Sequence, residues 1–170
     1  MAAVVIRTAG RRPAVGYQLE AVVRLATQDD AADVARLMIG FRNWQGKSEP
    51  ADDVIEATVR RLLADPNTEY LLAGSPPAGV CQLRYRLSVW TGTDDCCLED
   101  LFVDADVRGS GLGRELVEAA LERWRARGCT RMDLDANEAN APAQALYRSV
   151  GFDTWSAAAG GNDLFMRLRL

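Results

Sequence analysis

The sequence reads Leu98-Glu-Asp-Leu-Phe-Val103, Asp104-Ala-Asp-Val107 and Arg108-Gly-Ser-Gly-Leu-Gly113 across the stretch that decides the fold. Its apolar first segment predicts a strand, and the three alternating glycines predict a tight turn. A helical period then begins at Leu112 and continues to Arg127. The first turn of a helix carries unpaired backbone N–H groups and the positive end of the helix dipole. We therefore expect this turn to bind an anionic group.

Three interpretations of the glycine turn compete. A Rossmann dinucleotide site needs the spacing G-x-G-x-x-G, whereas Gly109, Gly111 and Gly113 follow G-x-G-x-G. A P-loop continues from its last glycine into Lys and then Ser or Thr, but here Arg114 and Glu115 follow. The third interpretation is that the glycines serve only the geometry of the turn. Spacing alone excludes the first two and leaves the third open.

Length and composition are those of one globular domain. The chain has 170 residues, of which 48% are apolar and 26% charged. We expect the domain to cover 21–170, and residues 1–20 to form a loosely held extension. The net charge of −4 argues against nucleic acid or an anionic membrane as a partner. No apolar run approaches the length of a membrane span, so we expect a cytoplasmic protein.

The chain contains no histidine and four cysteines. The lack of histidine excludes Ser-His-Asp and Cys-His catalysis and the commonest zinc sites. Any acid or base must then be Glu, Asp, Tyr, Lys or Cys. Cys81, Cys96, Cys97 and Cys129 form no CxxC pair, and we expect them to be buried, reduced thiols.

Strand and helix signals alternate along the chain. We expect a strand at 21–26, a helix that ends or loosens at Gly40, a loop at 41–50 and a second helix at 51–64. The later elements are expected to be strands at 69–73, 79–89 and 96–103, a helix at 111–127, a strand at 131–136, a helix at 141–149, and strands at 151–155 and 164–170. Strands that form hairpins and also cross over through helices indicate a single α/β domain.

Three motifs in this order resemble the GCN5-related N-acetyltransferase (GNAT) family. Arg108-x-x-Gly111-x-Gly113 at a helix start is similar to the family's acyl-CoA pyrophosphate loop, and Glu99-Asp-Leu-Phe-Val103 to its central strand. The segment Asn137-Glu-Ala-Asn-Ala-Pro-Ala-Gln-Ala-Leu-Tyr-Arg-Ser-Val-Gly-Phe152 is similar to its Asn…Tyr…Gly-Phe segment. The resemblance is strongest over 98–152. It implies an α/β GNAT fold, whose mixed, mostly antiparallel sheet has about six to seven strands, flanking helices and a splayed central pair.

The resemblance implies acetyl-CoA as the co-substrate and no metal. In the family, the main chain of the central strand pairs with the pantetheine arm, which assigns Leu101, Phe102 and Val103 to that role. The strand must then splay from its neighbour at 131–136. Glycines in the turn let backbone N–H groups approach the pyrophosphate. The other implied contacts are Arg108, Gly109, Ser110, Gly111, Leu112, Gly113, Arg114, Asn140, Pro142, Ala143 and Tyr147.

Acetyl transfer to an amine needs a base, and Glu99 is the candidate. Strand alternation predicts that Glu99 shares a face with Leu101, opposite Asp100 and Phe102, and that its carboxylate is not a solvated surface charge. Glu99 also matches the Leu-Glu-Asp glutamate of polyamine-type members of the family. Asp100 is the competing base. The alternative for Glu99 is a partly buried carboxylate in a structural hydrogen-bond network.

Tyr147 is the candidate acid. A phenol, with a pKa of about 10, suits a departing thiolate whose thiol resembles that of cysteine. Its spacing from Ala143 and Val150 also fits an ordinary core residue on a helix. Its place in the segment that resembles the family's motif favours the catalytic role.

The acceptor pocket in this family usually lies near the loop at 41–50 and the turn at 90–95. Trp44, Trp90, Asp94 and Glu99 would enclose a cation there by aromatic and carboxylate contacts. The alternative is ordinary packing of the tryptophans. We expect a small amine as the acceptor, because no extended peptide groove or basic docking surface is evident. Homodimers are common in such folds, and we expect one here.

These observations predict an N-acetyltransferase that moves an acetyl group from acetyl-CoA to a primary amine by direct attack. Glu99 is the expected base and Tyr147 the expected acid. Two alternatives remain: a non-catalytic acyl-CoA-binding regulatory module, and a protein or peptide N-terminal acetyltransferase.

Overall fold

The computed structural model describes residues 6–7, 22–156, 160–166 and 168. Contacts within the chain divide it into two units, Met1–Asp133 and Leu134–Leu170, which are described one at a time. Within the expected N-terminal extension, Ile6–Arg7 form the edge strand β1. The rest of that extension lies outside the described residues.

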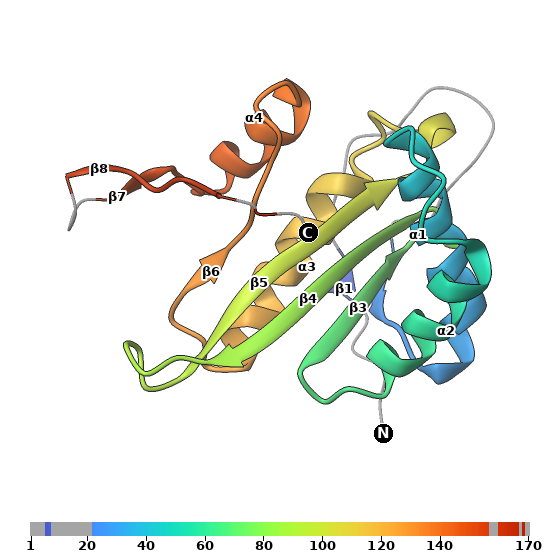
Figure 1. The fold of residues 1–170 in the computed structure, drawn as a ribbon, viewed down its shortest axis with the longest axis horizontal. Coiled ribbons are helices and arrows are strands. Elements are labelled where there is room, and N and C mark those ends of the chain that lie inside the picture. The colour runs from blue at the N-terminus through green and yellow to red at the C-terminus, as the bar shows by residue number, and fades with distance from the viewer. Residues whose placement is uncertain (1–5, 8–21, 157–159, 167, 169–170) are drawn as a thin grey trace. The chain divides into compact units, whose positions relative to one another are not determined.

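The first unit is built around a six-stranded sheet (Figure 1). In spatial order its strands are β1 (Ile6–Arg7), β2 (Val22–Leu25), β3 (Thr68–Ala73), β4 (Gly79–Leu87), β5 (Asp94–Val103) and β6 (Met132–Asp133). Neighbouring strands are antiparallel except β5 and β6, which are parallel. The expected mixed, mostly antiparallel sheet is therefore confirmed. The expected strand ends differ, because β4 stops at Leu87 and β5 already starts at Asp94.

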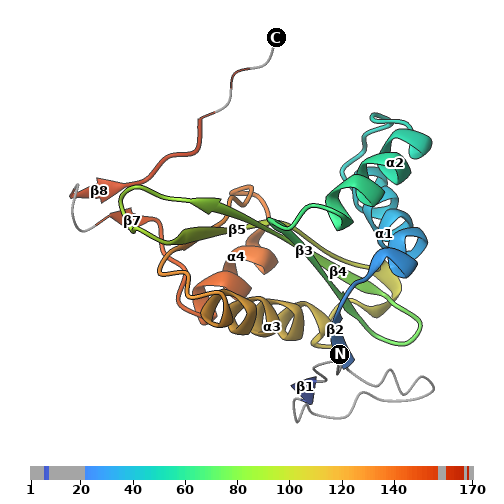
Figure 2. The same cartoon turned by 90° about the horizontal axis from the view of Figure 1, so that it is seen from below.

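Helices cover both faces of this sheet (Figure 2). α1 (Ala31–Trp44) and α2 (Asp52–Leu63) pack on one face, and α3 (Leu112–Ala126) packs on the other. The core beneath α1 and α2 includes Val34, Leu37, Ile55, Val59, Tyr70, Leu72, Val80 and Phe102. On the other face of the sheet, the side chains of Leu116 and Val117 on α3 are fully buried. The apolar faces predicted from the helical periods are thus the faces that the helices bury.

The expected end of the first helix at Gly40 is wrong, because α1 continues through Gly40 to Trp44. The ring of Phe102 lies against this turn of the helix. A Cβ on Gly40 would stand 3.2 Å from Cε1 of Phe102, closer than ordinary packing allows. Phe41 continues the contact by stacking on Phe102 with ring centroids 5.6 Å apart. The glycine therefore serves the close approach of α1 to β5, and no loop begins at 41.

The parallel pairing of β5 with β6 is short. It joins Cys96 to Met132 and Cys97 to Asp133, and β6 ends there. Within the part of the chain that the structure describes, the rest of β5 up to Val103 pairs with β4 alone. The ladder between β5 and its expected neighbour at 131–136 is thus confined to the start of β5, and the splay beyond residue 133 stays a prediction.

The second unit contains α4 (Ala141–Ser149) and a small hairpin of β7 (Trp155–Ser156) and β8 (Gly161–Asn162). The helix lies where its period predicts. The expected closing strand at 164–170 is wrong for residues 164–166 and 168, which have no strand structure, and its other residues lie outside the described ones. Of the expected strand at 151–155, only the last residue, Trp155, lies in a strand. The hairpin register ends at Asn162, so Leu164 has no ladder to continue.

Two further features bear on function. All four cysteines are free thiols; Cys81, Cys96 and Cys129 are buried as expected, whereas the expectation is wrong for Cys97, which is half-buried. Burial raises the pKa of the Cys96 thiol to about 12, so it stays protonated at neutral pH.

None of the helices formed by the described residues is long and apolar enough to cross a membrane. The same residues contain no cluster of three or more Cys, Asp or Glu side chains suited to a metal ion.

Candidate active site

A β-bulge in the middle of β5 positions Glu99. Gln82 on β4 is opposite Asp100, whereas the next residue, Leu83, is opposite Leu98, so Glu99 is the extra residue. A bulge breaks the alternation of side chains along a strand. Glu99 therefore lies beside Asp100 on the wall of one cleft. The prediction that these two carboxylates occupy opposite faces of the strand is wrong, because simple alternation takes no account of the bulge.

The cleft lies within the first unit, between the helices α1 and α2 and the strands β3, β4 and β5. Its volume is about 460 Å³. The lining residues are Met38, Phe41, Arg42, Gln45, Lys47, Glu49, Pro50, Ile55, Thr58, Val59, Leu62, Tyr70, Gln82, Arg84, Glu99 and Asp100. The helices supply mainly apolar side chains and the strands supply polar ones. A ligand would thus be oriented by the strands and packed by the helices.

Charges of both signs line the cleft. Glu99 is exposed, with 48% of its side chain accessible, and its Oε2 lies 3.8 Å from Nη1 of Arg84. The expectation of a shielded carboxylate is therefore wrong. Arg42 is held firmly, because it forms an ion pair of 2.7 Å with Asp52 and donates to the carbonyl of Pro50 at 2.6 Å. The Glu99 carboxylate remains accessible to a ligand from the cleft.

Tyr70 and Gln82 form the polar floor of the cleft. Both side chains are buried, and the Tyr70 hydroxyl donates to Oε1 of Gln82 at 2.9 Å. Burial raises the pKa of Tyr70, and the nearby carboxylates of Asp100 and Glu99 raise it further. Sequence analysis missed this pair. The available signal was Gln82, a polar residue within the apolar run of β4, but its partner is set by the register of β3.

The glycine turn joins β5 to α3. Gly109 and Gly111 have φ values of +81° and +102°, a region that side chains rarely adopt, and a Cβ at either would meet no atom within 4 Å. Gly111 is the N-cap of α3, and no side chain caps the helix there. Among the described residues, the N–H of Arg114 donates to the carbonyl of Gly111 at 2.9 Å, and no side chain caps the N–H groups of Leu112 and Gly113 at the positive end of the helix dipole. Backbone geometry makes this turn a site for an anion.

Comparisons with known proteins agree with this geometry. Residues 32–152 match the model of the acetyltransferase (GNAT) family. The chain belongs to the GNAT family. It is 30% identical over 138 residues to an aminoglycoside N(6')-acetyltransferase type 1 from Stenotrophomonas maltophilia, an alignment that covers 77% of this chain and 85% of the relative. The family uses acetyl-CoA as its acetyl donor, and the chain is an N-acetyltransferase.

Two further proteins are similar over most of the chain. The thialysine N-epsilon-acetyltransferase of Bos taurus is 26% identical over 154 residues, which are 82% of this chain and 88% of the relative. A crystal structure from Arthrobacter sp. FB24, described provisionally as an acetyltransferase, is 29% identical and has a TM-score of 0.80. That match covers 92% of this chain and 100% of the solved one. The α/β GNAT fold is therefore shown by sequence and by structure.

Two of the segments expected to bind the donor, the end of β5 and the glycine turn, lie in the first unit. Leu101, Phe102 and Val103 form the end of β5, and the main chain there is paired with β4 on one edge. Arg108 closes the start of the turn, because its Nε donates to the carbonyl of Val103 at 3.0 Å. Its guanidinium lies over the ring of Trp44, 5.0 Å from the centroid. Arg108 thus links the end of the central strand to the turn that follows it.

The residues expected to enclose the acceptor are not gathered in one place. Trp44 lies on α1 rather than on a loop, and it stacks on Phe41 at 6.0 Å. Trp90 is 87% exposed in the turn between β4 and β5. Asp94 begins β5, roughly 17 Å along the strand from Glu99. Of these four residues only Glu99 lines the cleft, because the β4–β5 turn lies at the far end of two long strands.

In the second unit, the family's Asn…Tyr segment forms α4. Asn140 is the N-cap of this helix, and its Oδ1 accepts from the backbone N–H of Ala143 at 3.3 Å. Pro142 lies in the first turn, where a missing N–H costs nothing. Tyr147 is buried, and its ring meets that of Phe152 edge-on at 6.0 Å. The motif thus has a structural role in its own helix.

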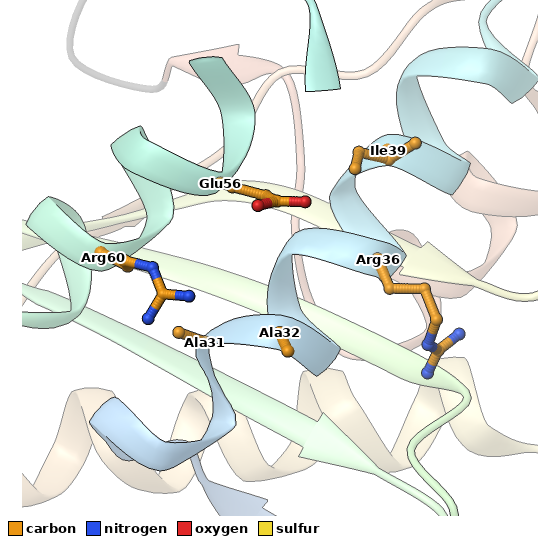
Figure 3. Close-up of a pocket in the computed structure, with 6 residues that line it drawn as sticks. All are labelled: Ala31, Ala32, Arg36, Ile39, Glu56 and Arg60. Carbon is orange, nitrogen blue, oxygen red and sulfur yellow. The ribbon is translucent and has the colours of Figure 1, made fainter. Parts of the chain in front are cut away.

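A second cavity, of about 220 Å³, lies between α1 and α2 (Figure 3). Its lining residues are Ala31, Ala32, Arg36, Ile39, Glu56 and Arg60. The guanidinium of Arg36 already has partners within the protein. It donates to the carbonyl of Pro77 at 2.5 Å and lies 3.4 Å from the carboxylate of Asp104. This cavity contains no residue of the bulge or of the glycine turn. It therefore lacks the carboxylate pair that distinguishes the larger cleft.

Proposed function

We propose that this GNAT enzyme transfers an acetyl group from acetyl-CoA to the primary amine of a small molecule by direct attack. The observation that carries this proposal is the bulge in β5, which sets the accessible Glu99 carboxylate beside Asp100 in the wall of the cleft. Amines are the acceptors in the names of the relatives, an aminoglycoside in one and thialysine in the other. Carboxylates in a cleft suit an acceptor that arrives as an ammonium ion.

The glycine turn fits the anionic end of acetyl-CoA. Coenzyme A carries a pyrophosphate, and the uncapped first turn of α3 offers N–H groups with the positive end of a dipole. Open space beside Gly109 and Gly111 lets the phosphate oxygens reach the backbone. We assign this role to Arg108, Gly109, Ser110, Gly111, Leu112, Gly113 and Arg114. Leu101, Phe102, Val103, Asn140, Pro142 and Ala143 are assigned to the pantetheine arm on the family resemblance.

The proposed chemistry needs two proton transfers. Acetyl-CoA, when bound, supplies an acetyl group on a thioester. Glu99 accepts the proton of the ammonium ion, and the freed nitrogen lone pair attacks the thioester carbonyl as the C–S bond breaks. The second N–H proton leaves the nitrogen through Tyr147, which donates its own proton to the departing thiolate and takes the nitrogen's proton in exchange. A positioned base contributes about 10²–10⁴-fold to such a rate, and Asp100 is the competing base.

The test is release of free thiol when the purified chain is given acetyl-CoA and a panel of primary amines. We expect amine-dependent thiol release and an acetylated product that mass spectrometry identifies. Reactions without amine correct for the protein's own thiols. Acetyl-CoA binding with no release for any amine would overturn the proposal in favour of a non-catalytic module. In the same assay, Tyr147→Phe should slow turnover about tenfold, and unchanged turnover would remove Tyr147 from the mechanism.

A further inference from the structure

Arg84 differs from the other cations of the cleft. Its Nε is buried and has no hydrogen-bond partner among the described residues. Its Nη1 and Nη2 lie 3.8 Å from Glu99 and 4.0 Å from Asp65, too far for hydrogen bonds. Arg42 and Lys47, in contrast, have partners at 2.6 Å and 2.5 Å. The Arg84 side chain is 40% exposed, so its Nη groups can donate charge-assisted hydrogen bonds to an anionic ligand in the cleft, whereas its buried Nε is out of a ligand's reach.

The neighbour of this guanidinium is the carboxylate of Glu99. The separation of 3.8 Å between Arg84 Nη1 and Glu99 Oε2 puts one positive and one negative group side by side in the cleft. A ligand that satisfies both must carry an ammonium and an anionic group on adjacent atoms. An α-amino acid has this arrangement. The cleft holds three cationic side chains, Arg42, Lys47 and Arg84, and three acidic ones, Glu49, Glu99 and Asp100. A polyamine or an aminoglycoside carries several positive charges, which the three cations would repel.

The helix side of the cleft indicates what the rest of the ligand is like. Met38 and Phe41 from α1 and Ile55, Val59 and Leu62 from α2 form an apolar wall opposite the charged strand residues. An apolar side chain would bury its surface against this wall.

We propose, on the basis of the N-acetyltransferase function proposed above, that the acceptor is an α-amino acid with an apolar side chain. Its carboxylate binds the guanidinium of Arg84, and its α-ammonium faces Glu99 and Asp100. Transfer forms the N–C bond of the acetylated amino acid and breaks the C–S bond of acetyl-CoA. Of the two protons that the ammonium nitrogen loses, one goes to Glu99 and the other ends on the thiolate, which leaves as free coenzyme A. Arg84 is a binding residue that selects the acceptor and takes no part in proton transfer.

The experiment compares leucine with two analogues that lack its carboxylate and with a polyamine. Thiol release is measured with L-leucine, L-leucinamide, 3-methylbutylamine and spermidine. We expect kcat/KM for L-leucine to exceed that for the other three by about 10- to 100-fold, the worth of hydrogen bonds to a charged group. Nε-acetyl-lysine, whose α-amine is free, should react faster than Nα-acetyl-lysine.

Arg84→Gln should remove the preference. It should raise KM for L-leucine about tenfold or more and raise KM for 3-methylbutylamine much less, because that amine has no carboxylate to lose. Arg86→Gln is the matched control. Arg86 lies on the same strand, pairs with Asp133 at 2.6 Å and does not line the cleft. Calorimetric titration with L-leucine should show the same loss of binding for Arg84→Gln and none for the control.

The outcomes separate this inference from the function on which it rests. Amine turnover with no preference for L-leucine, or equal losses for both acceptors in Arg84→Gln, overturns the α-amino acid and leaves the N-acetyltransferase standing. Absence of thiol release with every acceptor overturns the proposed function itself. Faster turnover of spermidine than of L-leucine identifies a polyamine as the acceptor and overturns the inference.

Discussion

The glycine turn and the cleft are built in opposite ways. The turn is made from consecutive residues, Arg108 to Arg114, and its proposed role rests on backbone N–H groups. The cleft is made from side chains of α1, α2, the segment between them and three strands. A backbone site of this kind suits a group shared by every acyl-CoA, whereas a side-chain site suits an acceptor that differs from enzyme to enzyme. If the proposed function holds, the comparison predicts that pyrophosphate and acceptor are recognised by separable parts of the first unit.

The strongest test of this separation is Glu99→Gln. Loss of the proposed base should lower kcat/KM for the amine by about 10²–10⁴-fold. Affinity for acetyl-CoA should stay within about twofold, because the turn contributes no side-chain contact to Glu99. Initial rates of thiol release and calorimetry measure the two quantities.

The control for that test is Glu56→Gln, which alters a carboxylate of the smaller cavity and should leave both quantities unchanged. Full activity of Glu99→Gln would show that the base is Asp100 or lies elsewhere.

Gly111→Ala tests the other region. A Cβ at φ +102° strains the N-cap of α3 and intrudes on the space where phosphate oxygens would lie. We expect the Kd for acetyl-CoA to rise about 10- to 100-fold, with KM for the amine little changed. Gly92→Ala is the matched control, since Gly92 also has a positive φ, +69°, but lies in the β4–β5 turn. Equal effects of the two variants on Kd would mean that strain alone, and no lost contact, explains the result.

Tyr70→Phe alters the floor of the cleft and tests whether the acceptor site can change without a change in acetyl-CoA affinity. The variant removes the donor to Gln82 and leaves a buried amide oxygen without its partner. It should lower the free energy of unfolding by about 1–2 kcal/mol and raise KM for the amine, while acetyl-CoA affinity stays the same. Denaturant unfolding and steady-state kinetics measure these effects. A change confined to acetyl-CoA affinity would contradict the separation of the two regions.

The smallest effect is expected for a change of Asp30, which belongs neither to the glycine turn nor to the cleft. The Arg24 guanidinium, which bonds to Asp30 at 2.6 Å, lowers the pKa of that carboxyl to about 2, below its ordinary 3.8. A lowered pKa in the folded state means that the pair stabilises the protein above pH 3.8 and that this stability is lost as the pH falls toward 2. Asp30→Asn should therefore cost about 1 kcal/mol at pH 6 and nothing at pH 2. Thermal unfolding across this pH range measures the difference, and a cost that does not depend on pH would exclude the ion pair as its cause.

Prediction from sequence succeeded where structure is local. α2, α3 and α4 lie within a residue or two of their expected bounds, because periodicity and capping residues act over neighbouring positions. It failed at Gly40, which looks like a helix end but makes room for Phe102, a residue far away in the chain. The sequence singles out Glu99 but predicts the wrong face of the strand for its side chain, because the bulge depends on the register of β5 with β4.

Consecutive residues alone specify the glycine turn, the helix that follows it and the motif order of the GNAT family. They do so because backbone torsions, capping and helical period are properties of neighbours in sequence. Only the folded chain decides that Glu99 stands beside Asp100, that Tyr70 bonds to Gln82 and that Arg84 lies 3.8 Å from Glu99. Each of these depends on cross-strand register and helix packing, which bring together residues that no local pattern connects.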